Sequence, residues 1–134
     1  SVMHRPLSLA LFGLALCAAM NAHADDAPER GRALYREHCS ACHAPDFNGA
    51  GPAHRGVVGR LAGTVPGFAY SPALKDAGFV WTPERLDRWL TDPEAVRPGQ
   101  RMGVSVADAA ERADLIAYLR TLGEAPQKET APRE

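Results

Sequence analysis

This chain contains little cysteine. Its 134 residues include only three, at Cys17, Cys39 and Cys42. An odd number of cysteines does not suit a disulfide framework. A disulfide between Cys39 and Cys42 would join residues too close in sequence to stabilise a domain of this size. A tetrahedral zinc site needs about four protein ligands, and no second cysteine pair supplies them. The cysteine content therefore excludes a disulfide-rich scaffold and argues against structural zinc.

An excess of positive charge and strand-like patterns are missing as well. Lysine and arginine together number 15 against 16 acidic residues, and lysine occurs only at Lys75 and Lys128. A protein that binds nucleic acid needs a strongly basic surface, so we expect no nucleic-acid partner. No segment alternates apolar and polar residues like a half-buried strand, and no internal repeat is visible. We therefore predict an all-α fold.

The longest apolar run, from Leu7 to Met20, is shorter than the roughly 20 residues that span a bilayer. It follows a positively charged start and precedes Ala-His-Ala at 22–24, with small residues at the two positions that a signal peptidase reads. We predict that residues 1–24 are a cleaved secretory signal peptide and that the protein is periplasmic, peripheral to the membrane at most. The alternatives are an uncleaved membrane anchor and a lipid anchor on Cys17.

Helix-start and helix-stop residues predict four helices. Acidic residues and a proline at 25–29 suit the start of the first, where a carboxylate is expected to cap the helix. The last is capped within 105–108, carries an apolar stripe that includes Ala109 and Ala113, and stops at Gly123. The helices are expected from 30 to 39, from 72 to the stop at Gly78, from 83 to the stop at Pro93, and from 109 to 122.

Two loops separate these helices, over residues 44–67 and 91–103, and the first is especially rich in glycine and proline. A loop of more than roughly 20 residues without periodicity of its own is unusual in a compact domain. Such a loop is expected when the chain wraps around something other than protein.

Residues 39–43 read Cys-Ser-Ala-Cys-His. Two thiols at this spacing, followed at once by histidine, are typical of a covalently attached haem, in which the histidine binds the iron. A thioredoxin-like pair belongs in an α/β fold, and a plain disulfide would not need His43. We therefore predict one haem c, attached through Cys39 and Cys42, with His43 as an iron ligand.

Met102 is the candidate for the second axial ligand, because it is the only methionine outside the predicted signal peptide. It lies in the 91–103 loop and not on an apolar helix stripe, where a packing methionine would be expected. Methionine sulfur raises the reduction potential and suits electron transfer. His38 and His54 compete with it. We expect His38 to be exposed, and His54 to be either a hydrogen-bonded loop residue or a group that ligates or tunes the iron.

Together these residues resemble a class I cytochrome c of the mitochondrial and soluble bacterial type. The resemblance extends from Gly31 to Leu122. It is carried by Cys39-Ser-Ala-Cys42-His43, Gly51-Pro52, Gly59-Arg60, Phe68-Ala-Tyr70-Ser71, Trp81, Pro98-Gly99-x-x-Met102 and Arg112-Ala-Asp-Leu-Ile-Ala-Tyr-Leu119.

The resemblance implies a cytochrome c fold over residues 25–122, in which helices wrap one haem. The first and last helices are expected to cross where Gly31 and Tyr35 meet Tyr118. The Pro52 carbonyl is expected to hold His43, and three further residues, Arg60, Tyr70 and Trp81, to hydrogen-bond the haem propionates. The polar segment 123–134 is expected to be a disordered tail.

The function implied is that of a monomeric single-electron carrier, not an enzyme, with a dehydrogenase, reductase or oxidase as transient redox partner. Two features depart from the family pattern. His54 stands where an aliphatic side chain is usual, and the lysine ring around the haem edge is largely missing, partly replaced by Arg88, Arg97 and Arg101. The alternatives are a dedicated subunit of a periplasmic dehydrogenase, and a haem peroxidase or gas sensor with a labile Met102.

Overall fold

The computed structural model describes residue 2 and residues 26–123. The segment 124–134 and, apart from residue 2, the predicted signal peptide lie outside this description. Strand-type pairing within the described residues is limited to two isolated bridges, His43 with Asn48 and Leu61 with Val80, which confirms the all-α prediction. The helices are α2 (Ala27–His38), α3 (Pro72–Lys75), α4 (Pro83–Thr91), α5 (Pro93–Val96) and α6 (Ala109–Thr121).

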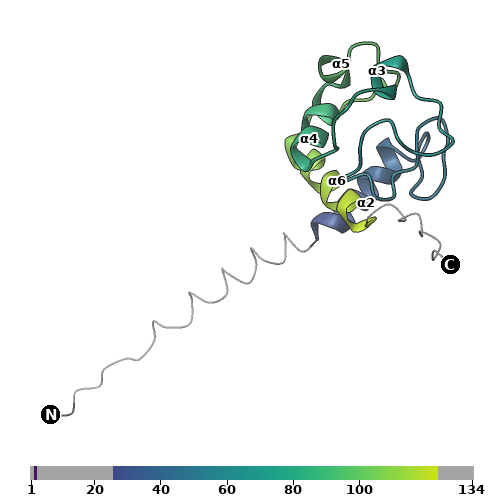
Figure 1. Cartoon of the computed structure of the whole chain (residues 1–134). Coiled ribbons are helices and arrows are strands. Elements are labelled where there is room, and N and C mark those ends of the chain that lie inside the picture. Colours follow the sequence, from purple (N-terminus) through teal and green to yellow (C-terminus); the bar gives the residue numbers. More distant parts are fainter. Residues whose placement is uncertain (1, 3–25, 124–134) are drawn as a thin grey trace, which may run out of the picture.

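The first and last of these helices, α2 and α6, cross at one edge of the molecule (Figure 1). Gly31 lies at the point of contact, because a Cβ atom there would be 1.9 Å from the backbone oxygen of Asp114 and 2.8 Å from the Cβ of Tyr118. Beside it the rings of Tyr35 and Tyr118 are 5.1 Å apart, and Arg30 donates two hydrogen bonds to the Asp114 carboxylate. The helix crossing expected from the resemblance is confirmed.

Side-chain caps begin two of the predicted helices. The Thr82 hydroxyl accepts a hydrogen bond from the backbone N–H of Arg85 at 3.1 Å, and the Asp108 carboxylate accepts from two N–H groups at the start of α6. The expectation of a carboxylate cap on α2 is wrong for Asp26. Its backbone is already near-helical, with φ −86° and ψ −5°, and its side chain makes no capping bond, because capping needs a more extended backbone at that residue.

The predicted 91–103 loop contains a short helix that the sequence pattern did not indicate. Asp92 ends α4 and also begins α5, where its carboxylate accepts a hydrogen bond from the N–H of Ala95 at 3.2 Å. Pro93 ends α4 as expected, but it also occupies the first turn of α5, where its restricted φ suits a helix start. The α3 helix is shorter than predicted and ends at Lys75, before Gly78.

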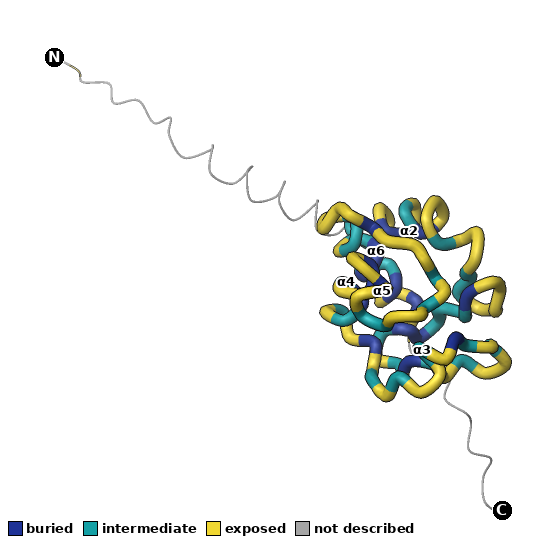
Figure 2. Tube along the Cα trace, turned by 90° about the horizontal axis from the view of Figure 1, so that it is seen from above, coloured by how far each residue is buried: buried dark blue, intermediate teal, exposed yellow. Residues whose placement is uncertain are grey.

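The core joins α4, α6 and the end of α2 to side chains from the long loop. Leu115 on α6 is only 1% exposed, and the rings of Trp81 and Trp89 meet edge-on at 5.3 Å. Ala109 and Ala113, predicted on the apolar stripe, are exposed because α6 buries a narrower stripe centred on Leu115. Buried residues lie toward the middle of the molecule in Figure 2. Over the described residues, no helix combines the length and apolarity needed to cross a bilayer.

We predict that Gly31→Ala destabilises the folded protein by about 1–3 kcal/mol, a typical cost of overpacking. Alanine normally favours a helix over glycine by about 1 kcal/mol, so a helix that was not in contact with α6 would be stabilised instead. Chemical denaturation measures the difference in the free energy of unfolding. The control is Arg32→Ala on the same helix, an exposed position that should change stability by less than about 0.5 kcal/mol. A more stable Gly31→Ala protein would contradict the prediction.

Candidate cofactor-binding site

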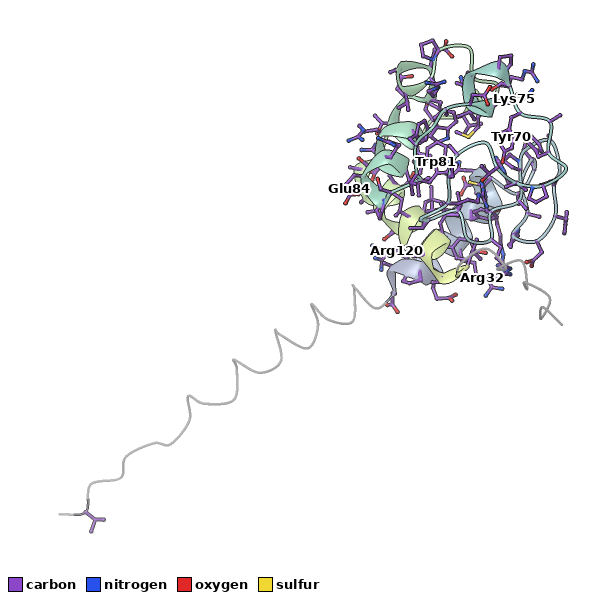
Figure 3. The ribbon with its side chains drawn as sticks, viewed as in Figure 1. Arg32, Tyr70, Lys75, Trp81, Glu84 and Arg120 are labelled. Carbon is purple, nitrogen blue, oxygen red and sulfur yellow. The ribbon has the colours of Figure 1, made fainter. Side chains whose placement is uncertain are left out.

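A cavity of about 280 Å³ brings together residues that are far apart in the sequence. Its wall contains every site residue that the sequence predicted: Cys39, Cys42, His43, Pro52, Arg60, Tyr70, Trp81 and Met102. Figure 3 shows Tyr70 and Trp81 in the interior, between α4 and the long loop, while Lys75 and Glu84 lie on the outer surface. These eight residues therefore bring two thiols, an imidazole, a thioether and a guanidinium to one cavity.

The Cys-x-x-Cys-His motif is placed by the end of α2. Cys39 is the C-cap of that helix and donates its backbone N–H to the oxygen of Tyr35 at 2.9 Å. The N–H groups of Cys42 and His43 then both bond to the Cys39 oxygen, which makes residues 39–43 a tight turn. Burial and, to a smaller extent, the Cys42 charge raise the pKa of the Cys39 thiol to about 11. Among the described residues no three His, Cys, Asp or Glu side chains gather into a metal-binding group.

His43 presents a ring nitrogen suited to a metal. Its Nδ1 lies 2.7 Å from the backbone oxygen of Pro52. Because a carbonyl oxygen only accepts hydrogen bonds, the proton is on Nδ1 and the Nε2 lone pair is left for a ligand. Burial lowers the pKa of His43, partly offset by the bond to Pro52. The imidazole is therefore neutral at neutral pH, as a metal ligand must be.

Two neighbours confine the plane of the His43 ring. A Cβ on Gly51 would lie 2.2 Å from Cε1 of that ring and 2.5 Å from both nitrogens, which places it over the ring face and not in the ring plane. The His54 ring stacks on His43, with centroids 4.0 Å apart and planes at 19°. Nδ1 of His54 is hydrogen-bonded to the Tyr35 hydroxyl at 2.8 Å. His38, the other competing histidine, is exposed as predicted.

A buried cation marks another part of the same cavity. Arg60 donates hydrogen bonds to the backbone oxygens of Arg55 and Ala53, at 3.1 and 3.2 Å. Its Nε is buried and, like the buried Oγ of Ser71, has no hydrogen-bond partner among the described residues. Burial lowers the pKa of Arg60, with the Tyr70 hydroxyl opposing. A buried guanidinium and hydroxyl with unmet hydrogen bonds suit an anionic group, and the carboxylates of a haem fit that requirement.

Ser71 is a candidate that sequence reasoning missed. The sequence predicts no role for its side chain: Ser71 is the last residue of the Phe68-Ala-Tyr70-Ser71 motif and directly precedes the helix expected from 72. The structure buries its side chain on the cavity wall, and its hydroxyl makes no capping bond. Neighbouring Tyr70 has its oxygen engaged by the N–H of Val65 at 3.0 Å. The sequence signal that could have identified it is its place in the Phe68-Ala-Tyr70-Ser71 motif, directly after Tyr70.

Met102 lies in the segment between α5 and α6, partly buried against the core. The segment is anchored before it, where the N–H of Gly99 bonds to the Glu94 carboxylate at 2.8 Å, and after it, where the N–H of Val106 bonds to the Leu90 oxygen at 2.7 Å. Apart from the two thiols of the motif, its thioether is the sulfur that the described part of the chain offers to this cavity. A thioether held between two anchors has the chemistry of a soft metal ligand.

The rest of the wall is largely apolar. It is formed by side chains of the long loop, α3, α4 and α6, including Val57, Leu74, Leu86, Trp89, Leu115 and Leu119. These side chains come from segments that are separated in sequence, so the cavity exists only in the folded chain. An apolar wall with a few convergent polar groups is typical of a cofactor site.

Comparison with known proteins agrees with this geometry. The protein-family model for cytochrome c matches residues 28–123. Cytochrome c2 of Rhodomicrobium vannielii is 38% identical over 121 residues, which are 87% of this chain and 96% of that protein. The cytochrome c-type cyt cy of Rhodobacter capsulatus is 48% identical over 94 residues, which are 69% of this chain and 47% of that protein. The solved structure of cytochrome cH from Methylobacterium extorquens has a TM-score of 0.67 at 40% identity, covering 70% of this chain and 97% of that one.

We predict that Gly51→Ala disturbs the His43 ring. The new methyl group would overlap the imidazole, so the ring must tilt away from the Pro52 oxygen or the loop must shift. The expected results are a loss of about 1–3 kcal/mol in the free energy of unfolding and an altered absorption spectrum of the holoprotein. The matched control is Ala50→Ser, at the exposed neighbouring position, which should leave both unchanged. A wild-type free energy of unfolding and a wild-type spectrum for Gly51→Ala would contradict the prediction, because the loop would then accommodate the methyl group without cost.

Proposed function

This chain belongs to the cytochrome c family and binds one covalently attached haem c, and from that premise we propose that it is a periplasmic carrier of single electrons whose axial iron ligands are His43 and Met102. The observation that carries the proposal is the convergence on one cavity of the two thiols, the Nε2 lone pair of His43 and the thioether of Met102. The signal-peptide pattern in residues 1–24 supports export.

The bound haem supplies a one-electron couple between ferric and ferrous iron. The chain's own residues keep that couple free of other chemistry. Cys39 and Cys42 tether the group to the end of α2, and His43 offers a neutral nitrogen already oriented by Pro52. The Met102 thioether would supply the second ligand to the iron, and it would then block the approach of oxygen or peroxide. With both ligands supplied by the chain, the bound group would carry electrons and would not turn over a substrate.

The surrounding side chains limit rearrangement when the charge changes. The apolar wall from α4 and α6 excludes water, so few dipoles reorient on electron transfer. Arg60 contributes a fixed buried cation, and its Nε and the Ser71 hydroxyl are assigned to the haem carboxylates, together with Tyr70 and Trp81. These groups are held by hydrogen bonds and packing before any electron arrives, which lowers the reorganisation that each transfer requires.

Partners are proposed to dock briefly near the cavity opening, where Arg101 is exposed on the rim. Redox encounters of this kind are usually small, under roughly 1,200 Å² of total buried surface. The chain is proposed to act as a monomer that exchanges electrons with dehydrogenases, reductases or oxidases. A monomer that several donors reduce is the expected behaviour in solution. Copurification with a single dehydrogenase in a fixed ratio would instead identify a dedicated subunit.

We predict that Met102→Ala removes the methionine–ferric charge-transfer band and lowers the reduction potential by on the order of 0.1 V, within the roughly 0.8 V range that axial ligands cover. The ferrous form of the variant should bind carbon monoxide rapidly, whereas wild-type protein should not. Optical redox titration measures the first two effects and gas titration the third. Val104→Ala is the matched control, because Val104 lines the cavity in the same segment and is 39% exposed.

The wild-type spectrum decides among the alternatives to this ligand set. Rapid carbon monoxide binding by wild-type protein would favour a peroxidase or gas sensor with a labile Met102. A charge-transfer band that persists in Met102→Ala would show that another residue provides the sulfur ligand or that the band has a different origin. A protein without covalent haem would refute the proposal as a whole.

We predict that the exported protein begins at Asp25. Mass spectrometry of periplasmic protein should give the mass of residues 25–134 plus one haem. Replacing both Ala22 and Ala24 with leucine should block cleavage, because a signal peptidase needs small side chains there. His23→Leu, between those two positions, is the matched control and should be cleaved normally. An intact N-terminus in the membrane fraction of wild-type cells would instead indicate an anchor.

A further inference from the structure

We propose that His54 is a positioning residue for His43: its stacked ring holds the plane of the iron-binding imidazole, and its polarity lowers the reduction potential below that of an aliphatic side chain at the same place. This inference rests on the proposed function, since it takes His43 as an axial ligand. The resemblance implies an aliphatic residue at this position, so His54 is a departure from the expected pattern. The departure therefore has an identifiable physical consequence.

The hydrogen bond to Pro52 alone leaves the His43 ring some freedom. A single N–H···O contact tolerates a broad range of angles, so the imidazole can tilt while Nδ1 stays within reach of the Pro52 oxygen. The His54 ring removes that freedom, because it lies face to face with His43 at a centroid distance of 4.0 Å and an angle of 19°. Tilting His43 would drive one ring into the other or open a gap in the packing.

His54 is itself held from several directions. Its backbone N–H bonds to the Ala44 oxygen at 3.0 Å, and its own oxygen accepts from the N–H of Val57 at 2.9 Å. Its Nδ1 is bonded to the Tyr35 hydroxyl at 2.8 Å. Tyr35 is buried at the α2–α6 crossing, 4% exposed. A continuous set of contacts therefore leads from the helix crossing through Tyr35 and His54 to the ligand.

The same geometry argues against His54 as an iron ligand in its own right. A ring stacked on His43 lies beside that ligand, on the same side of the cavity, and so cannot occupy the axial position opposite His43. Its Nδ1 is already engaged by Tyr35. The sequence left His54 open as a hydrogen-bonded loop residue or as a group that ligates or tunes the iron. The bond to Tyr35 confirms the first, and the stacked geometry favours tuning over ligation.

The expected electronic effect follows from polarity without net charge. The Nδ1 of His54 pairs with a hydroxyl, and no carboxylate among the described residues is hydrogen-bonded to the ring, so a protonated ring would lack a counter-charge and the neutral form is favoured. A neutral imidazole carries a substantial permanent dipole, whereas the hydrocarbon side chain of leucine has almost none. The ferric site bears one more positive charge than the ferrous site, and polar surroundings favour it. Replacing His54 with leucine should therefore raise the potential.

The test compares three holoprotein variants with the wild type. His54→Leu removes the stacked ring, Tyr35→Phe removes only the hydroxyl that holds it, and Tyr118→Phe removes a hydroxyl from the same helix crossing that is not bonded to His54. Two quantities are measured: the paramagnetically shifted haem-methyl resonances of the ferric protein, which depend on the orientation of the axial ligand planes, and the reduction potential. A melting curve reports any general loss of stability.

We expect His54→Leu to change the spread of the methyl resonances and to shift the potential upward. Tyr35→Phe should shift both in the same direction by a smaller amount, and Tyr118→Phe should leave both at wild-type values. Wild-type resonances and potential in His54→Leu would overturn the inference. Equal shifts in Tyr35→Phe and Tyr118→Phe would also overturn it, because the helix crossing and not His54 would then be responsible.

If His54→Leu fails to accumulate as holoprotein, the two tyrosine variants decide the matter by themselves. Failure of the proposed function is recognised separately, in the wild type. A wild-type protein without a low-spin spectrum and methionine charge-transfer band would refute the His43 and Met102 ligation. If the wild type shows the low-spin spectrum and the charge-transfer band, and His54→Leu has wild-type methyl resonances and reduction potential, only the positioning role is refuted.

Discussion

The close approach of α2 and α6 at Gly31 is the contact on which the position of the cofactor site depends. The helices pass so near each other that the backbone oxygen of Asp114 occupies the space of a Gly31 side chain. Because Cys39 caps α2 and the turn to His43 follows without a break, the crossing sets where the thiols and the imidazole lie. The same crossing turns Leu115 of α6 into the core, where it becomes part of the cavity wall.

The two candidate axial ligands are supported in different ways. His43 is confined by groups that touch the ring itself, the Pro52 oxygen, the bare backbone of Gly51 and the His54 ring. Met102 is positioned by its backbone, in a segment anchored to Glu94 before it and to α4 after it. A planar imidazole has an orientation that affects its bonding to a metal, whereas a thioether mainly needs to be within reach. The denser support on the histidine side matches that difference.

The polar part of the cavity illustrates a second constraint, the cost of burying charge. Arg60 is desolvated without a carboxylate partner among the described residues, and backbone oxygens of the long loop satisfy only part of its hydrogen-bonding capacity. Such an arrangement is unfavourable for the protein alone. It becomes favourable when an anionic group binds nearby, so a haem with carboxylates would stabilise the fold of the loop that surrounds it. Loop structure and cofactor binding are therefore linked.

The sequence by itself determined the features that depend on neighbours in the chain. The helical class, the caps at Thr82 and Asp108 and the Cys-x-x-Cys-His motif follow from local rules of capping, periodicity and spacing, and the structure contains all of them. Local rules also produced the errors: a proline interpreted only as a stop hid α5, and an acidic residue at a helix start suggested a cap that Asp26 does not make.

Only the tertiary structure decided what His54 and Ser71 contact. Tyr35 and His54 are 19 positions apart, and no periodicity or motif links them. They meet because the α2–α6 crossing and the fold of the long loop bring both to one side of His43. Likewise, in the sequence Ser71 only precedes a predicted helix, whereas burial on the cavity wall gives its hydroxyl a use there. Side-chain contacts across such separations depend on packing between distant segments, which the order of residues does not display.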